Sequence, residues 1–205
     1  QAVTSSLLNK GFTRDKKMTT TNQYKGNTMN TQDQTNENQK DTPAIYVGTY
    51  AKYNNGSIAG KWLSLDKYNT EEKFYDAARK LHKNEHDPEL MFQDCENFPN
   101  EFYGESGCDS RLWEWLALDK DQREIVTAWL DQVGGTDSIE YIIDSFVGSA
   151  DSWPEYVENY AEIMGDIDSI PEHLQSYFDY DAYGQDLRHD YKVADTSNGV
   201  LVFAC

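Results

Sequence analysis

The feature that most constrains this chain is a long interval without a lysine or arginine, which runs from Arg123 to Arg188. The 64 residues between these two arginines carry 15 aspartates and glutamates against one histidine, His173. Net charge of this size works against compactness because like charges repel one another. An ordinary protein surface mixes lysines among its acids. The interval therefore poses the question of why a folded protein would keep so much unbalanced negative charge.

The excess of acids belongs to the chain after residue 42. The 205 residues have a formal net charge of −18. Residues 1–42 hold six Lys/Arg and four acids (+2), so residues 43–205 hold 12 Lys/Arg and 32 acids (−20). Acid-rich chains are often disordered, but disordered chains contain few aromatic residues. All five tryptophans and most tyrosines of this chain lie in its acidic part, which predicts a folded acidic protein.

The remaining bulk features limit the class of protein. Residues 1–42 are a polar run rich in Thr, Asn and Gln, and we expect a disordered arm. Cys95, Cys108 and Cys205 are scattered without a CxxC pair, which favours a reducing cytosol over a disulfide framework or a zinc site. No run approaches the roughly 20 apolar residues of a membrane span, and the N-terminus lacks a signal core. These features favour a cytoplasmic protein that binds no membrane.

Residues 43–108 predict a small N-terminal α+β domain. The run AIYVGTY is β-prone, NNG signals a turn and SIAGKWLSL favours a second strand, so we expect a hairpin. The run ELMFQDCENF favours a third strand. Between them, TEEKFYDAARKLHKN predicts a helix with one apolar face: Phe74, Ala77, Ala78 and Leu81.

Residues 109–148 predict a helical middle domain. SRLWEWLAL and DQREIVTAWLDQV both have helical periodicity, and a Gly-Gly pair follows the second. Asp137 with Glu140 resembles a capping box in front of a third apolar pattern that extends to Phe146.

Residues 149–205 predict a C-terminal α+β domain. Ser152 with Glu155 resembles another capping box, and the chain closes with two β-prone runs around Asn198-Gly199, the signal of a hairpin. The fold class is therefore α+β, with three small domains in a row.

The helices of the acidic interval separate apolar from charged residues. A helix beginning near 169–172 would bury Leu174, Tyr177 and Phe178 and leave its acids in water. Like charges three and four residues apart on a helix cost a few tenths of a kcal/mol per pair. The preceding helix has three glutamates at this spacing on one face, and that face contains no cation: Glu155, Glu158 and Glu162.

Catalytic and metal sites are poorly supported. His82 and His86 are four residues apart, but Lys83 stands where a zinc protease needs glutamate. The stretch 179–190 echoes an EF-hand loop, yet it has Asp190 where the bidentate glutamate is expected. Thirty-two acids contain many carboxylate pairs, so a hydrolase stays open as an alternative, although no pair stands out. We therefore expect no catalytic residues, no metal and no cofactor.

The sign of the charge excludes direct binding of nucleic acid, because affinity for phosphates comes from Lys and Arg. The same charge suits an imitation of nucleic acid. Duplex DNA carries one charge per ~1.7 Å of axis, and acids four residues apart on a helix are about 6 Å apart. Two or three such helices side by side would approach the charge density of a duplex. Composition alone does not decide between a DNA mimic and a merely acidic protein, such as that of a halophile.

Three strings resemble the ArdA antirestriction family: PAIYVGTYAKYNNGSIAGKWLSL (43–65), DPELMFQDCENFP (87–99) and IPEHLQSYFDYDAYGQDL (170–187). The resemblance runs from about Pro43 to near the C-terminus. It implies an elongated, curved, dimeric chain of three domains, shaped and charged like bent B-form DNA. It further implies a noncatalytic inhibitor that occupies the DNA site of type I restriction–modification enzymes, on the methyltransferase core with its specificity and modification subunits. Such proteins are typically carried by plasmids and transposons.

The resemblance also suggests roles for individual residues. The antirestriction motif of the family would map to about 163–187, near a dimer interface, so four rings either meet a second subunit or belong to the monomer core: Tyr177, Phe178, Tyr180 and Tyr183. Antagonists of other DNA-binding proteins that use the same mimicry stay open as an alternative. The acids expected to replace phosphates are Glu124, Asp131, Asp137, Glu140, Asp144, Asp151, Glu155, Glu158, Glu162, Asp166, Asp168, Glu172, Asp179, Asp181 and Asp186.

Overall fold

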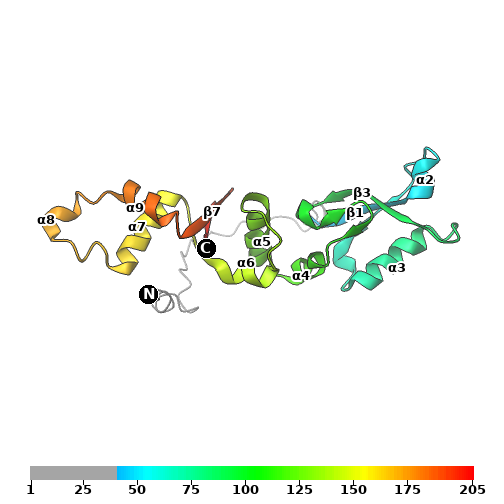
Figure 1. Cartoon of the computed structure of the whole chain (residues 1–205). Helices are drawn as coiled ribbons and strands as arrows, with labels where there is room; N and C mark the ends of the chain where they lie inside the picture. Colours follow the sequence, from blue (N-terminus) through cyan, green and yellow to red (C-terminus); the bar gives the residue numbers. More distant parts are fainter. Residues whose placement is uncertain (1–40) are drawn as a thin grey trace, which may run out of the picture.

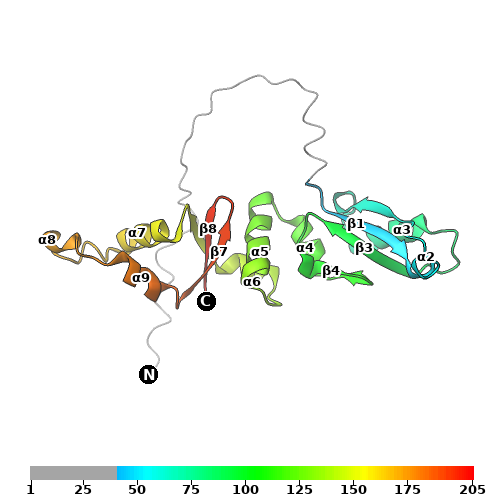
Figure 2. The same cartoon turned by 90° about the horizontal axis from the view of Figure 1, so that it is seen from above.

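The structure, a computed structural model, describes residues 41–205. These residues form an elongated molecule whose elements follow one another along one long axis (Figure 1). Helices α2 (Tyr50–Asn54) and α3 (Glu71–Leu81) lie at one end and α8 (Glu172–Gln175) lies at the other, and the view from above shows the same order (Figure 2). The arm expected at 1–42 lies outside the described residues, except for its last two.

The N-terminal part is an antiparallel three-stranded sheet with one helix on one face. The sheet has the order β2-β1-β3, and its strands are β1 (Ala44–Thr49), β2 (Lys61–Ser64) and β3 (Leu90–Glu96). Helix α3 packs on it through the expected apolar face, with Phe74 and Ala78 fully buried and the ring of Phe74 centred 5.7 Å from that of Phe92. The smaller elements here are η1 (Leu65–Lys67), η2 (Asn100–Phe102), β4 (Tyr103–Gly104) and β5 (Gly107–Cys108).

The link between β1 and β2 is longer than the expected turn. The hairpin pairing is confirmed, but a short helix, α2, fills the link before the turn at Asn55 and Gly56. Thr49 starts this helix because its side chain accepts a hydrogen bond from the backbone N–H of Lys52 at 3.3 Å. Such a cap satisfies a donor that the first turn of a helix leaves free.

The middle part consists of α4 (Arg111–Ala117), α5 (Lys120–Gln132) and α6 (Ile139–Ser145), as the helical periodicity predicted. Asp119 and Gln122 form a reciprocal capping box at the start of α5. The expected cap of α6 is wrong by one residue, because Ser138 and not Asp137 accepts the hydrogen bond from the N–H of Tyr141.

The C-terminal part combines an antiparallel sheet of order β6-β8-β7 with helices on one side. Its elements are β6 (Phe146–Ala150), α7 (Trp153–Met164), α8, α9 (Tyr180–Leu187), β7 (Tyr191–Thr196) and β8 (Gly199–Ala204). The closing hairpin is confirmed by the pairing of β7 with β8. Phe146, expected at the end of a helix, instead opens β6, where it pairs with Phe203 across the sheet. This strand was missed because its partner residues lie 50 to 57 positions away in the chain.

The helix expected to bury Leu174, Tyr177 and Phe178 is much shorter than predicted. Helix α8 ends at Gln175, and Asp179 caps a separate helix, α9. Leu174 is 45% exposed and Tyr177 is 81% exposed, so the expected buried stripe is wrong for both. Phe178 lies between the two helices and is half-buried.

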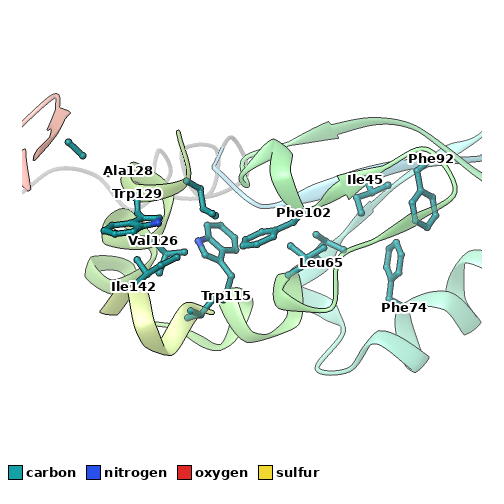
Figure 3. Close-up of a cluster of buried hydrophobic side chains, with 14 of the residues drawn as sticks. Ile45, Leu65, Phe74, Phe92, Phe102, Trp115, Val126, Ala128, Trp129 and Ile142 are labelled. Carbon is teal, nitrogen blue, oxygen red and sulfur yellow. The ribbon is translucent and has the colours of Figure 1, made fainter. Parts of the chain in front are cut away.

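One continuous core joins the N-terminal sheet to the C-terminal sheet. Figure 3 shows its buried side chains from Phe74 and Phe92, through Phe102 and Trp115, to Trp129 on α5. Trp129 then meets Phe203 of β8 edge to face, with ring centroids 5.0 Å apart. The other face of β8 belongs to a second cluster, made by Val200, Val202 and Tyr156 of α7. The α+β class is confirmed, and the boundaries of the three domains stay a prediction.

Candidate functional site: an acidic surface without counter-charges

The fifteen acids of the interval lie mainly on the outside of α5 to α9 and in the loops between them. Twelve of them are exposed: Asp131, Glu140, Asp144, Asp151, Glu155, Glu158, Glu162, Asp168, Glu172, Asp179, Asp181 and Asp186. The other three are half-buried: Glu124, Asp137 and Asp166. Most of these carboxylates therefore lie in solvent, as the helical periodicity predicted.

None of these carboxylates belongs to an ion pair of residues 41–205. The ion pairs of this part of the chain are Lys52–Glu85, Arg79–Asp76 and Arg111–Asp109, all of which lie before the interval. Two opposite charges in an ion pair largely cancel in the electrostatic potential around the protein. Unpaired carboxylates contribute their full negative charge to that potential.

The two arginines that border the interval contact aromatic rings. The guanidinium of Arg123 lies 4.9 Å from the centre of the Trp115 ring and also donates to the backbone oxygen of Leu116. The guanidinium of Arg188 lies 4.7 Å from the centre of the Trp153 ring. These cation–π contacts hold the two bordering arginines against aromatic rings rather than against the acids between them.

Helix α7 shows how the sequence directs acids outward. Ser152 caps it by accepting from the N–H of Glu155, and a proline in the first turn suits the helix start. Its buried residues are Tyr156, Val157 and Ala161, while Glu155, Glu158 and Glu162 are exposed. Consecutive residues rise by about 1.5 Å along a helix, so Glu158 and Glu162 are about 6 Å apart along the axis. Glu155 also accepts a hydrogen bond from the N–H of Asp151 at 3.0 Å.

Two further acids also make hydrogen bonds that stabilise the fold. Asp179 caps α9 by accepting from the N–H of Ala182 at 2.9 Å. Asp166, in the loop after α7, accepts a hydrogen bond of 2.5 Å from the hydroxyl of Tyr183 on α9. Burial and this neighbouring carboxylate raise the pKa of the Tyr183 phenol above its ordinary value. These hydrogen bonds restrict the side-chain conformations of both acids.

The acidic surface also extends beyond the interval. Partial removal from water and the negative charge of Glu101 raise the pKa of Asp131 on α5. Glu101 belongs to η2, in the N-terminal part, and lies outside the acidic interval that the sequence pointed to. The missed signal was the acid-rich run of β3 and η2, which supplies Asp94, Glu96 and Glu101.

The four aromatic residues expected at a dimer interface divide into two groups. Phe178, Tyr180 and Tyr183 pack on one another, with ring centroids 4.8 Å and 5.3 Å from that of Phe178. Tyr177 instead is strongly exposed, two residues after the end of α8. Other large apolar side chains near it in sequence are also exposed. We call this set the apolar tip: Ile163 (58% exposed), Met164 (55%), Leu174 (45%) and Tyr177 (81%).

Of the two histidines that resembled metal ligands in the sequence, His82 has a structural role and His86 is exposed. His82 is buried, and its Nδ1 lies 2.5 Å from the ammonium of Lys52, which is also paired with Glu85 at 3.2 Å. Burial and the charge of Lys52 lower the pKa of His82, so it is a neutral acceptor. The stretch that echoed a calcium loop forms helix α9. Residues 41–205 contain no cluster of three or more His, Cys, Asp or Glu able to hold a metal ion.

A search of the described residues finds no helix long and apolar enough to cross a membrane. Among family models, that of the antirestriction protein (ArdA) matches residues 45–202, from the start of β1 to within β8. No curated protein matches the chain.

Proposed function

The chain belongs to the antirestriction protein (ArdA) family, and from that premise we propose that it is a DNA mimic that inhibits restriction–modification enzymes. The observation that carries the proposal is the set of fifteen carboxylates in residues 124–187, which have no ion-pair partner in the described part of the chain. In the proposed complex these carboxylates take the places of DNA phosphates in contacts with arginine and lysine.

The amount and spacing of charge support this mechanism. An excess of 20 acids over residues 43–205 equals the charge of roughly 34 Å of duplex, at one charge per ~1.7 Å. The elements that carry the acids succeed one another along an elongated molecule (Figure 1). A protein cleft that accepts a rod of negative charge would accept this shape for the same electrostatic reason.

The proposed target is a type I enzyme, at the DNA site formed by its methyltransferase core with the specificity and modification subunits. Inhibition is by occupancy alone, without catalysis, cofactor or metal. Because both restriction and modification need the same DNA-binding site, the mimic blocks both. No single carboxylate dominates, since each replaces one phosphate contact among many.

A homodimer would double the length of the mimic. The proposed contact between subunits is at the apolar tip, within the segment of about 163–187 onto which the family resemblance would map the antirestriction motif. Exposed apolar side chains gathered in one region are typical of an interaction surface. Tyr177 supplies the largest exposed area there, and Phe178, Tyr180 and Tyr183 form the ring cluster behind it.

The test is displacement of DNA from a type I methyltransferase. The purified enzyme is bound to a fluorescently labelled duplex that contains its recognition sequence, and the chain is titrated in while anisotropy is followed. Full release of the duplex, with a midpoint that rises steeply with salt, is the expected result. Retention of the duplex at saturating protein, or inhibition of cleavage while DNA stays bound, would contradict mimicry.

Two controls show what the displacement means. An unrelated acidic protein of the same net charge tests whether charge alone is enough, and it should release little DNA. A histone-like protein and a recombinase, each bound to labelled DNA, test the alternative target classes. Release from these at lower concentrations than from the methyltransferase would assign the mimic to another partner.

A further inference from the structure

The face of the N-terminal sheet opposite α3 carries an open groove of about 760 Å³. In β1, Tyr46 alternates with Ile45 and Val47, which are fully buried on the α3 side. Successive strand residues point to opposite faces, so Tyr46 lines the groove together with Trp62 of β2. Tyr53 and Tyr103 add two more rings. The groove lies far along the chain from the acidic interval that carries the proposed function.

Internal hydrogen bonds hold two of the rings in place. The hydroxyl of Tyr46 donates to the backbone oxygen of Ile58 at 3.1 Å and accepts from the N–H of Gly60 at 3.2 Å. A Cβ on Gly60 would lie 2.5 Å from the backbone oxygen of Val47, so only glycine allows this loop to approach so closely. The hydroxyl of Tyr103 donates to the backbone oxygen of Phe92 at 2.7 Å. The walls of the groove are therefore preorganised, which lowers the entropy cost of binding.

The charge of the groove is negative. Asp94 and Glu105 line it, both are exposed, and no lysine or arginine of residues 41–205 lines it. Neither carboxylate belongs to an ion pair of this part of the chain. The backbone oxygen of Glu105 accepts from the N–H of Phe92 at 2.7 Å, which fixes this residue beside the sheet. Partial burial and the nearby Glu105 raise the pKa of the Tyr50 phenol.

A hydrogen-bond acceptor in the groove has no donor among the described residues. Gln93 lines the groove, and its side-chain oxygen is buried without a hydrogen bond. This oxygen lies against Gly48, where an added Cβ would come within 2.8 Å of it. A buried acceptor without a partner destabilises the fold, because it has given up its hydrogen bonds to water. The amide would gain a hydrogen bond by turning toward a donor that enters the groove.

We propose that this groove binds an arginine side chain of a partner protein. Aromatic faces attract cations, the two carboxylates supply opposite charge, and Gln93 supplies an acceptor. Guanidinium suits this combination better than ammonium, because it is planar, stacks on rings and carries five donors. The inference rests on the proposed function only for the source of the arginine, a DNA-binding enzyme rich in such side chains. The groove would add one specific contact to an acidic surface whose charge is otherwise distributed over many residues.

The groove is tested without any enzyme, by nuclear magnetic resonance of the ¹⁵N-labelled full chain. The probe is Nα-acetyl-arginine methylamide, and the reporters are the indole N–H of Trp62 and the backbone amides of Gln93 and Glu105. We expect saturable shifts at these positions with a dissociation constant of about 1 mM, the range for a few kcal/mol. The citrulline counterpart, which has the same shape without charge, should cause almost none.

Variants separate the groove from the general acidity of the chain. Trp62→Ala should weaken binding about fivefold or more, and Trp62→Phe should keep most of it because a ring remains. Glu105→Gln should weaken binding, whereas Glu158→Gln, which removes the same charge on α7, should not. If Trp62→Ala fails to fold, the two glutamate variants still decide the question.

Four outcomes would overturn the proposal. They are equal shifts with citrulline, shifts spread over acids of the whole chain, equal binding by Glu105→Gln and Glu158→Gln, and groove signals that depend on protein concentration without probe. The last would assign the groove to a second copy of the chain. Because the titration contains no restriction enzyme, its failure leaves the displacement experiment standing, and failure of displacement leaves the arginine groove standing.

Discussion

The hydroxyl of Tyr183 donates a hydrogen bond of 2.5 Å to the carboxylate of Asp166, joining α9 to the loop that follows α7. Asp166 is thus one of the acids assigned to the partner and also a structural anchor of the C-terminal part. The ring of Tyr183 also contacts the ring of Tyr160 on α7, with the two ring centroids 6.4 Å apart. The acidic surface and the packing beneath it therefore depend on each other.

Removing this hydroxyl should destabilise the fold without removing charge. For Tyr183→Phe we expect a loss of about 1.5–3 kcal/mol in the free energy of unfolding, the usual range for a hydrogen bond to a charged group. The measurement is urea denaturation at neutral pH. Tyr177→Phe is the matched control, because it removes a hydroxyl from an 81% exposed ring and should change little. Equal effects in the two variants would argue against the anchoring role of Asp166.

The tyrosine cluster should make the protein sensitive to alkali. Burial raises the pKa of Tyr156 to about 12, and burial together with Tyr160 raises the pKa of Tyr191. An unfolded tyrosine has a pKa of about 10. The folded state thus holds these protons more tightly, so the stabilisation is complete below about pH 10 and is lost as the pH rises through the folded values. Denaturation at stepped pH should show this fall, and Tyr156→Phe should reduce its slope. An identical slope in the variant would contradict the assignment.

Charge neutralisation should be tolerated singly and not in bulk. Glu158→Gln should change the midpoint of DNA displacement by less than about twofold, because one contact among many is lost. Eight such changes together, at the exposed acids of α6 to α9, should abolish displacement while the circular dichroism spectrum is kept. A single neutral substitution that abolished inhibition in a folded protein would count against distributed charge.

The apolar tip should control the association of subunits. Tyr177→Ser combined with Ile163→Ser removes two exposed apolar groups and should convert a dimer to monomer in sedimentation velocity runs at micromolar concentration. Ile58→Ser serves as the control, since Ile58 is 74% exposed and belongs to the link that follows α2 in the N-terminal part. An unchanged sedimentation coefficient in the double variant would remove the tip from the interface.

A two-point hydrogen bond should hold α5 to the C-terminal sheet. The side-chain amide of Gln132 donates to the backbone oxygen of Asp195 at 2.5 Å and accepts from its N–H at 2.8 Å. Gln132→Ala should therefore cost about 1–3 kcal/mol and should speed hydrogen exchange at the N–H of Asp195. Gln132→Glu is a useful companion, because it keeps the acceptor and loses the donor. Unchanged exchange in both variants would show that the contact adds nothing to stability.

Periodic patterns predicted most elements because they depend on neighbouring residues. The apolar spacing of Phe74 and Ala78 led directly to α3, and Ser152 marked the start of α7. Strand β6 was missed because a five-residue run gains its structure by pairing with residues of β8 that lie 50 to 57 positions later. The groove could not be predicted for the same reason: Tyr46, Trp62 and Glu105 come together only after the sheet has formed.

The sequence by itself determined the charge, the α+β class and the outward direction of the acids, because helical periodicity and the cost of burying a carboxylate are properties of local segments. Only the tertiary structure decided which groups the arginine side chains contact. Arg123 and Arg188 border the acidic interval in sequence, yet each lies over a tryptophan instead of beside a carboxylate. It also separated Tyr177, exposed at the apolar tip, from the packed rings of Phe178, Tyr180 and Tyr183. These contacts depend on which elements pack together across the whole chain, and a run of neighbouring residues does not contain that information.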